Sequence, residues 1–222
     1  MTGKNKSFSH DNVDYSESED GYQLQVSETE SDIHLEKLNL GPRKKLLIMN
    51  LNGLLLCRTN RRNKEEIPRH NIDAALNHAI GALKSKLLFV WDQDRCTNSG
   101  FKSLEIKFKP LFFKELSKVW DNVKKGGPYS ASNTLLIDDK PYKALLNPLD
   151  TAIFPEPYKP KDEVDRVLDP KGELCLYLKG LADAHDVQSY VKEHPFGQPA
   201  ITSSHPDWEF YSQVQACLRR KN

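Results

Sequence analysis

Short, continuous apolar runs alternate with segments of helical periodicity from Lys44 onward. The runs Leu46–Asn50, Leu87–Trp91 and Thr134–Ile137 have the length and composition of buried strands. Between the first two runs, apolar residues recur at helical spacing over residues 72–83. Strands that are apolar on both faces and separated by helices are typical of an open, mostly parallel sheet with both faces covered. The pattern therefore predicts an α/β fold.

The same criteria predict the remaining elements. Pro110 is expected to open a helix that carries Phe113, Leu116 and Trp120 on one side. Further along the chain we expect a short strand over Thr151–Phe154, an edge strand over Leu174–Leu178, a helix over Leu181–Val191, a Pro- and Ser-rich linker over 194–206, and a last helix over 207–219.

Charge is distributed unevenly along the chain. The formal net charge is +1, but residues 1–40 carry 9 acidic and only 3 basic side chains. A polar, acidic segment without apolar periodicity predicts a disordered tail. We therefore expect an acidic tail over residues 1–43, a domain over 44–195, and a linker with a C-terminal helix over 196–222. The near-neutral total argues against a direct nucleic-acid partner.

Several classes of protein are excluded by simpler features. The four cysteines form no CxxC pair, so neither a zinc ribbon nor a disulfide scaffold is indicated. The longest apolar stretch, 46–57, is interrupted by polar residues and falls short of the roughly 18 residues of a membrane span. The first residues have neither the apolar core of a secretion signal nor the arginines of a mitochondrial presequence. We expect a nuclear or cytoplasmic location in preference to a mitochondrial one.

Polar side chains follow two of the predicted strands. Asn50 is the last residue of the first predicted strand and Asn52 lies just beyond it, whereas Asp138 and Asp139 follow the strand Thr134–Ile137. Ligands of open α/β sheets bind at the carboxyl ends of the strands, so these four residues are candidates for a site. Spacing alone favours a role of the two aspartates in capping the helix start that follows them, and this alternative stays open.

Three segments together resemble a known family. IMNLNGLL (48–55), KPLFFKELSKVW (109–120) and LLIDDKPYK (135–143) resemble the haloacid-dehalogenase-type phosphatase domain of the RNA polymerase II C-terminal-domain phosphatases, also called the NLI-interacting-factor-like domain. The resemblance covers residues 44–195, and the segments LLFVWDQDRCT, NTLLIDDKPYKALLNP and HPFGQPAI are most similar to a plant-type branch. It implies a three-layer, Rossmann-like haloacid-dehalogenase fold and a phosphoprotein or other protein partner.

The resemblance also implies a chemistry for the strand ends. In the family the first strand ends in Asp-x-Asp; the first Asp becomes an aspartyl-phosphate and the second transfers the proton. A Mg²⁺ ion, held by the first Asp and by a residue after a later strand, neutralises the developing charge. By this resemblance Asp139, with Asp138, matches the metal position. Lys114 matches the phosphate-binding lysine, with Lys109 as the second candidate. The charged residues around Lys114, taken alone, favour a solvated side chain on a helix surface.

The chain departs from the family pattern because Asn50 and Asn52 stand where the two aspartates are expected. A carboxamide is neutral, a poor nucleophile and a weak Mg²⁺ ligand beside a carboxylate. Loss of a nucleophile costs roughly 10⁴ to 10⁶ in rate. We therefore expect a catalytically dead or severely impaired domain that acts as a protein-binding pseudophosphatase, with weak or absent Mg²⁺ binding. Two alternatives stay open: an active Mg²⁺-dependent phosphoserine/phosphothreonine phosphatase, and a subunit like the receptor of the mitochondrial presequence translocase, which uses a similar domain without phosphatase chemistry.

A second departure is the short segment between the first strand and the first helix. The family has a helix and a strand there, and the strand carries a phosphate-binding Ser or Thr. Here only CRTNRRNKEEIPRH (57–70) intervenes, and its polar composition is unsuited to a buried strand. We expect one central strand to be missing. Either Leu87–Trp91 pairs with the first strand in its place, or that strand keeps an unpaired edge.

Overall fold

The computed structural model describes residues 44–54, 74, 76–77, 80–125, 127–157 and 170–220. The chain divides after residue 40, and all described residues belong to the unit that spans residues 41–222. The predicted acidic tail over residues 1–43 and the whole segment 57–70 therefore lie outside the described residues.

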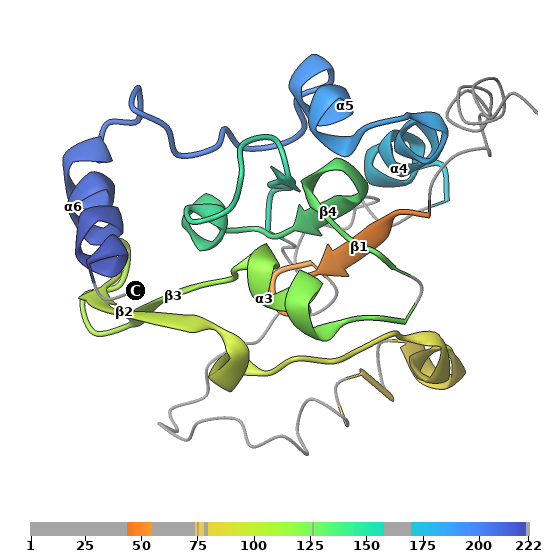
Figure 1. Ribbon diagram of the computed structural model, residues 1–222, viewed down its shortest axis with the longest axis horizontal. Coiled ribbons are helices and arrows are strands. Elements are labelled where there is room, and N and C mark those ends of the chain that lie inside the picture. Colours follow the sequence, from red (N-terminus) through yellow and green to blue (C-terminus); the bar gives the residue numbers. More distant parts are fainter. Residues whose placement is uncertain are drawn as a thin grey trace, which may run out of the picture. The chain divides into compact units, whose positions relative to one another are not determined.

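Three parallel strands form the central sheet in the order β1-β4-β5, with β1 spanning Leu46–Met49, β4 Thr134–Ile137 and β5 Ala152–Ile153 (Figure 1). Each residue of β1 pairs with one residue of β4, from Leu46 opposite Thr134 to Met49 opposite Ile137. All four residues of β4 are buried, as expected of a continuous apolar run in a middle strand. The predicted parallel sheet is confirmed, and its strands at 46–49, 134–137 and 152–153 lie where the apolar runs placed them.

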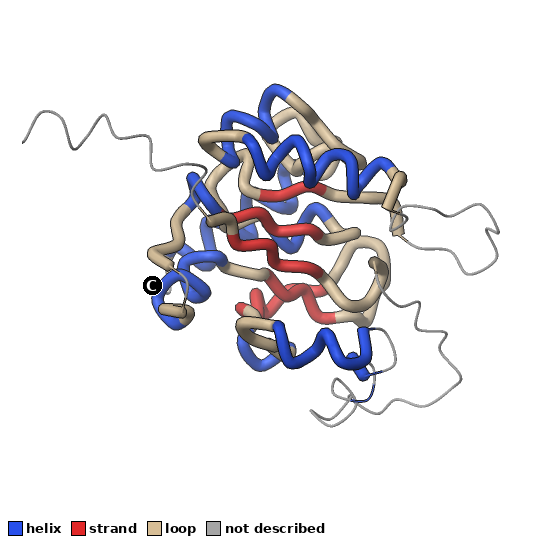
Figure 2. The backbone as a smooth tube through the Cα atoms, turned by 90° about the vertical axis from the view of Figure 1, so that its right-hand side faces the viewer, coloured by secondary structure: helices blue, strands red, loops and turns tan. Residues whose placement is uncertain are grey.

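Helices cover both faces of this sheet, which gives three layers (Figure 2). On one face Leu46 packs against Val119 of α3 (Leu116–Asn122) and against Val123. On the other face Leu135 and Ile137 pack against α4 (Glu173–Asp183) and α5 (Val187–Glu193). The predicted α/β class, consistent with a Rossmann-like haloacid-dehalogenase fold, is therefore confirmed.

An antiparallel hairpin of β2 (Thr97–Lys102) and β3 (Pro110–Phe113) stands beside the sheet. The last helix, α6 (Trp208–Arg219), packs on it and on the 3₁₀ helix η4 (Pro141–Ala144) (Figure 1). Val214 of α6 is fully buried together with Leu111 and Phe113 of β3. The helix predicted over 207–219 is thus confirmed, and it shares an apolar core with the hairpin.

The helix predicted to begin at Pro110 is wrong. Residues 110–113 form β3, and the helix begins only at Leu116. The reason is visible in the burial pattern, because Leu111 and Phe113 are fully buried whereas Pro110 is exposed and Phe112 is half-buried. This alternation has the period of a strand. Proline is tolerated here because it is the first residue of the strand.

The strand predicted over Leu87–Trp91 is also wrong. The rings of Phe89 and Trp91 are tilted against each other with centroids 5.3 Å apart and pack beside Leu46, but the segment forms no strand. Among the described strands β1 therefore pairs with β4 alone, and Leu47 is 42% and Met49 37% exposed. Of the two possibilities for the missing strand, repair by residues 87–91 is excluded.

Two further elements differ from the expectation. The segment predicted as an edge strand, Leu174–Leu178, belongs to α4, because Leu174, Tyr177, Leu178 and Leu181 recur at helical spacing toward the core. The helix predicted over Leu181–Val191 is two helices, since α4 ends at Asp183 and α5 begins at Val187. Asp186 caps α5 by accepting a hydrogen bond from the Ser189 backbone N–H at 2.7 Å.

The helix predicted over residues 72–83 lies partly outside the described residues. Residues 74, 76, 77 and 80 are helical, and the 3₁₀ helix η1 follows over Gly81–Lys86. A shorter 3₁₀ helix, η2 (Gln93–Arg95), precedes β2, and η3 (Ala131–Asn133) precedes β4. In the part of the chain that the structure describes, no helix combines the length and apolar character needed to cross a bilayer.

Candidate functional site

The polar residues at the carboxyl ends of β1 and β4 lie side by side. Asn50 directly follows β1, and its backbone N–H donates to the Ile137 carbonyl of β4 at 2.9 Å, which extends the sheet by one more bond. Asp138 and Asp139 follow β4 directly. Asn50 and both aspartates are buried. The parallel register thus brings together residues that are almost ninety positions apart in sequence.

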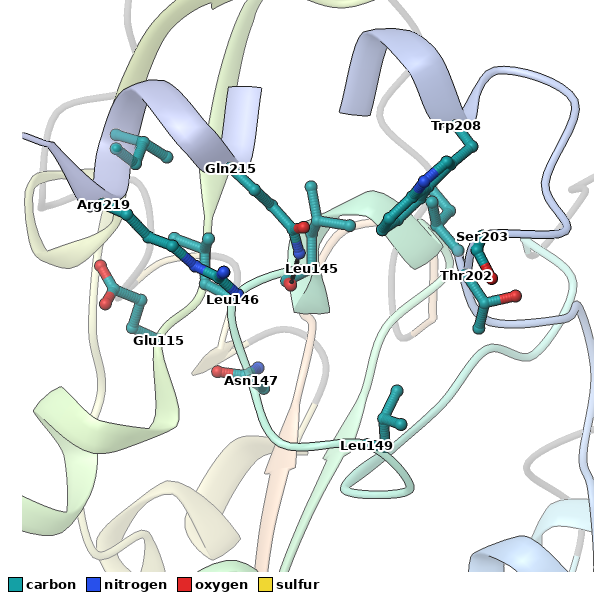
Figure 3. Close-up of a pocket in the computed structure, with 12 residues that line it drawn as sticks. Glu115, Leu145, Leu146, Asn147, Leu149, Thr202, Ser203, Trp208, Gln215 and Arg219 are labelled. Atoms are coloured by element: carbon teal, nitrogen blue, oxygen red, sulfur yellow. Dashed lines mark hydrogen bonds between the residues drawn. The ribbon is translucent and has the colours of Figure 1, made fainter. Parts of the chain in front are cut away.

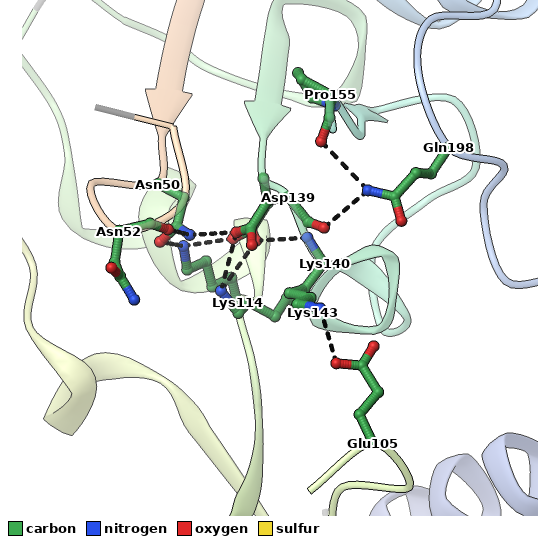
Figure 4. A network of polar contacts seen from close by, with 10 residues as sticks. Asn50, Asn52, Glu105, Lys114, Asp139, Lys140, Lys143, Pro155 and Gln198 are labelled. Carbon is green, nitrogen blue, oxygen red and sulfur yellow. Dashed lines mark hydrogen bonds and ion pairs between the residues drawn. The ribbon is translucent and has the colours of Figure 1, made fainter. Parts of the chain in front are cut away.

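Lys114 enters the same site from the loop between β3 and α3 (Figure 4). Its amine donates to Asn50 Oδ1 at 2.7 Å and to Asp138 Oδ2 at 2.6 Å. Its backbone is held from two sides, since its N–H donates to the Lys143 carbonyl and its carbonyl accepts from Asn147 Nδ2, both at 2.8 Å. The side chain is therefore held in the site and is not a solvated residue on a helix.

Asp138 is neutralised by two lysines. Lys114 contacts one carboxylate oxygen, and Lys143 contacts the other at 3.0 Å. The Lys140 backbone N–H also donates to Asp138 at 3.0 Å, so the carboxylate satisfies the turn that follows β4 as well. Burial by itself would raise the pKa of Asp138, but the two ammonium groups hold it below its usual value. Burial acts in the other direction on the Lys114 amine and lowers its pKa, because burial disfavours the charged form of either group. The nearby Asp138 carboxylate opposes this change.

Asp139 has a different environment. Its Oδ1 accepts a hydrogen bond from Asn50 Nδ2 at 2.8 Å, and the nearest ammonium group, that of Lys143, is 3.9 Å away. Burial raises the pKa of Asp139, with a further contribution from Asp138. The backbone carbonyl of Asp139 accepts from Gln198 at 3.0 Å, which ties it to the segment after α5 (Figure 4).

The turn after β1 closes over Asp139. Gly53 has a φ of 96°, in the region that favours glycine. A methyl group at this position would lie under 3.0 Å from the carboxylate atoms of Asp139. Asn52 precedes it, and its backbone carbonyl accepts the second N–H of the Asn50 carboxamide. The Asn52 side chain is exposed and points away from the network (Figure 4).

The sequence predicts Asn50, Lys114, Asp138 and Asp139 as site residues, and the structure brings all four together. The side chain of Lys109, the second candidate, has no hydrogen bond to them in the described part of the chain; burial lowers its pKa, and Lys143 and Lys140 lower it further. Lys143 and Gln198 are not among the predicted site residues, although both lie in the segments that carry the family resemblance. Lys143 could have been singled out because it lies four residues after Asp139, and Gln198 because it lies in HPFGQPAI.

The Mg²⁺ ion that the resemblance implies does not fit the side chains present. The donors at the site are one carboxamide and two carboxylates, and one of these carboxylates is already paired with two lysines. Two ammonium groups would face an added dication. Among the described residues, no three His, Cys, Asp or Glu side chains come together as a metal site.

A separate cavity of about 630 Å³ lies between α6 and the loop after η4 (Figure 3). The cavity is lined by several leucines, by Trp208 and Arg219 of α6, and by Glu115 and Asn147. Asn50, Asp138 and Asp139 do not line this cavity. It is therefore distinct from the strand-end site.

The chain was compared with protein families, curated proteins and solved structures. Residues 79–188 match the family model described as NLI interacting factor-like phosphatase. This range contains Lys114, Asp138 and Asp139 but begins after Asn50 and Asn52. No curated protein and no solved structure gave a significant match. The match agrees with the α/β fold and with the residues gathered at its strand ends, and it shows that the chain carries a domain of the NLI interacting factor-like phosphatase family.

Proposed function

We propose that this domain binds a protein partner and does not hydrolyse phosphate esters. The proposal rests on Asn50, whose carboxamide lies between Lys114 and Asp139 at the end of β1. It occupies the position where the family's nucleophilic carboxylate is expected.

The chemistry of a carboxamide explains the loss. An aspartyl-phosphate forms when a carboxylate oxygen bonds to phosphorus while the ester oxygen leaves. The amide oxygen of Asn50 carries no formal charge, and it already accepts a hydrogen bond from Lys114. The amide nitrogen has no available lone pair, and both of its N–H groups are donated. Loss of a nucleophile lowers turnover by roughly 10⁴ to 10⁶.

The remaining parts of a phosphatase site are weakened as well. Asn52 has no proton to give to a leaving oxygen at neutral pH and no carboxylate to take one from water. The family is generally Mg²⁺-dependent, but we expect weak or absent Mg²⁺ binding here. We also propose that the segment 57–70 replaces the family's phosphate-binding strand; the family match, which starts at residue 79, supports this.

The hairpin loop supports a role in binding proteins. Leu104, Ile106 and Phe108 lie between β2 and β3 and are 48%, 52% and 76% exposed. The amines of Lys102 and Lys107 lie 5.5 and 6.0 Å from the Phe108 ring centroid. Exposed apolar side chains of this kind, with basic neighbours, are typical of surfaces that contact another protein, and phosphoproteins would suit the lysines.

Turnover of an aryl phosphate ester in the presence of Mg²⁺ tests the proposal. Wild-type protein should hydrolyse the ester no faster than the Asp139→Asn variant, which lacks the carboxylate facing Asn50. Turnover that EDTA and the Asp139→Asn substitution both abolish would establish an active phosphatase instead.

A further inference from the structure

We infer that the NH₂ group of Asn50 takes the place of a divalent cation and ties the end of β1 to the end of β4 without metal. The inference rests on the proposed function, since it explains how the site holds together once the nucleophile is lost. Its evidence lies in the contacts, orientation and charges around Asn50.

Two oxygens from different strand ends converge on one nitrogen. Asn50 Nδ2 donates to Asp139 Oδ1 at 2.8 Å and to the backbone carbonyl of Asn52. A carboxamide nitrogen has two N–H groups, so both are used. A carboxylate oxygen and a carbonyl oxygen that face the same point are also the donor types that a hard cation prefers.

The partners fix the orientation of the carboxamide. Asn50 Oδ1 faces the Lys114 amine, which can only donate, whereas Nδ2 faces two groups that can only accept. The reversed orientation would put N–H against N–H and oxygen against oxygen. The NH₂ group therefore points to the oxygens and not to the lysine.

The charges around Asn50 balance without a cation. Asp138 and Asp139 carry two negative charges, and Lys114 and Lys143 carry two positive charges. A carboxylate at position 50 would leave the site with one excess negative charge. It would also place three acceptor oxygens together, those of residues 50, 52 and 139, with no donor between them.

The space around Asp139 agrees with this arrangement. Gly53 lies so close to the Asp139 carboxylate that a methyl group there would overlap it. The turn thus holds the Asp139 carboxylate beside the Asn50 NH₂ group, so the chain itself supplies the donor between these oxygens.

Thermal unfolding of the Asn50→Asp variant tests the inference. The variant should unfold at a lower temperature than wild type in EDTA. Mg²⁺ at about 100 times its dissociation constant should then raise the Tm of the variant by roughly 5–10 °C. The Tm of wild type should be the same in MgCl₂ and in EDTA at matched ionic strength.

Two control variants separate the causes. Asn52→Asp adds the same charge on an exposed side chain, so its Tm should not respond to Mg²⁺. The exchange variant Asn50→Asp/Asp139→Asn reverses donor and acceptor across the 2.8 Å contact. It should recover most of the lost Tm in EDTA and should not respond to Mg²⁺.

Calorimetric titration of wild type with MgCl₂ covers the case in which Asn50→Asp does not fold. No binding heat is expected at millimolar Mg²⁺. Binding heat together with a rise in wild-type Tm would overturn the inference, as would a folded Asn50→Asp variant that ignores Mg²⁺. Neither result depends on turnover, so the inference and the proposed lack of activity can fail separately.

Discussion

Asp138 and Asp139 are neighbours in the chain, but their carboxylates have opposite electrostatic environments. Two lysines hold the pKa of Asp138 down, whereas burial raises the pKa of Asp139. Asp138 therefore stabilises the folded state fully at pH values above the pKa that it has in the unfolded chain. This contribution is lost as the pH falls through its lower pKa in the folded state. The contribution of Asp139 has the opposite sign, because its carboxylate is easier to bury when protonated.

Replacement of Lys143 by Met should weaken the acid dependence that comes from Asp138. The variant loses a hydrogen bond to a buried charge, which costs about 1.5–3 kcal/mol at neutral pH. As the pH falls through the lowered folded pKa of Asp138, the difference from wild type should shrink, because the protonated carboxyl no longer needs the lysine. Urea unfolding at a series of pH values measures this.

Lys140→Met is the matched control for this substitution. The Lys140 amine pairs with the half-exposed Glu105, so its loss should change the free energy of unfolding by at most about 1 kcal/mol. If the two variants showed the same pH dependence, the assigned role of Lys143 would be wrong.

At the scale of single elements, the turn after β1 determines the shape of the site. It brings the Asn52 carbonyl back to the Asn50 side chain and places Gly53 against Asp139. Gly53 needs its positive φ, and it also has no room for a Cβ. Gly100 in β2 has a similar φ, 79°, but open space around it.

The Gly53→Ala and Gly100→Ala variants separate these two effects. Alanine at positive φ costs about 1–2 kcal/mol, so Gly100→Ala should lose about that much stability. Gly53→Ala should lose clearly more, because the methyl group also displaces Asp139. Chemical denaturation gives both values, and equal losses would show that the turn does not press on the carboxylate.

Local pattern predicts some elements well and others poorly. Thr134–Ile137 is predicted with its observed bounds because every residue of a middle strand is apolar or β-branched and buried. Residues 110–113 and 174–178 are assigned to the wrong class, because a short apolar run fits both periods. Leu87–Trp91 has the composition of a strand, but only the side chains of Phe89 and Trp91 pack against the core.

At the scale of the whole molecule, the sheet joins residues that the sequence keeps far apart. The candidate site is predictable as a set of residue types, since Asn50 and the two aspartates follow strands that the pattern identifies. The contacts of Lys114 depend on tertiary packing, because β3, η4 and Asn147 all fix its loop. The charges around it favour a solvated lysine, and only the resemblance points to the site.

Intact-protein mass spectrometry tests the central claim most directly, since the claim is that no residue at the end of β1 can be phosphorylated. The protein is incubated with acetyl phosphate and Mg²⁺, quenched in acid and measured, and any modified peptide is sequenced. We predict an unchanged mass and an intact amide at Asn50. A phosphoryl group on residue 50, with or without conversion of its amide to a carboxylate, would contradict the account.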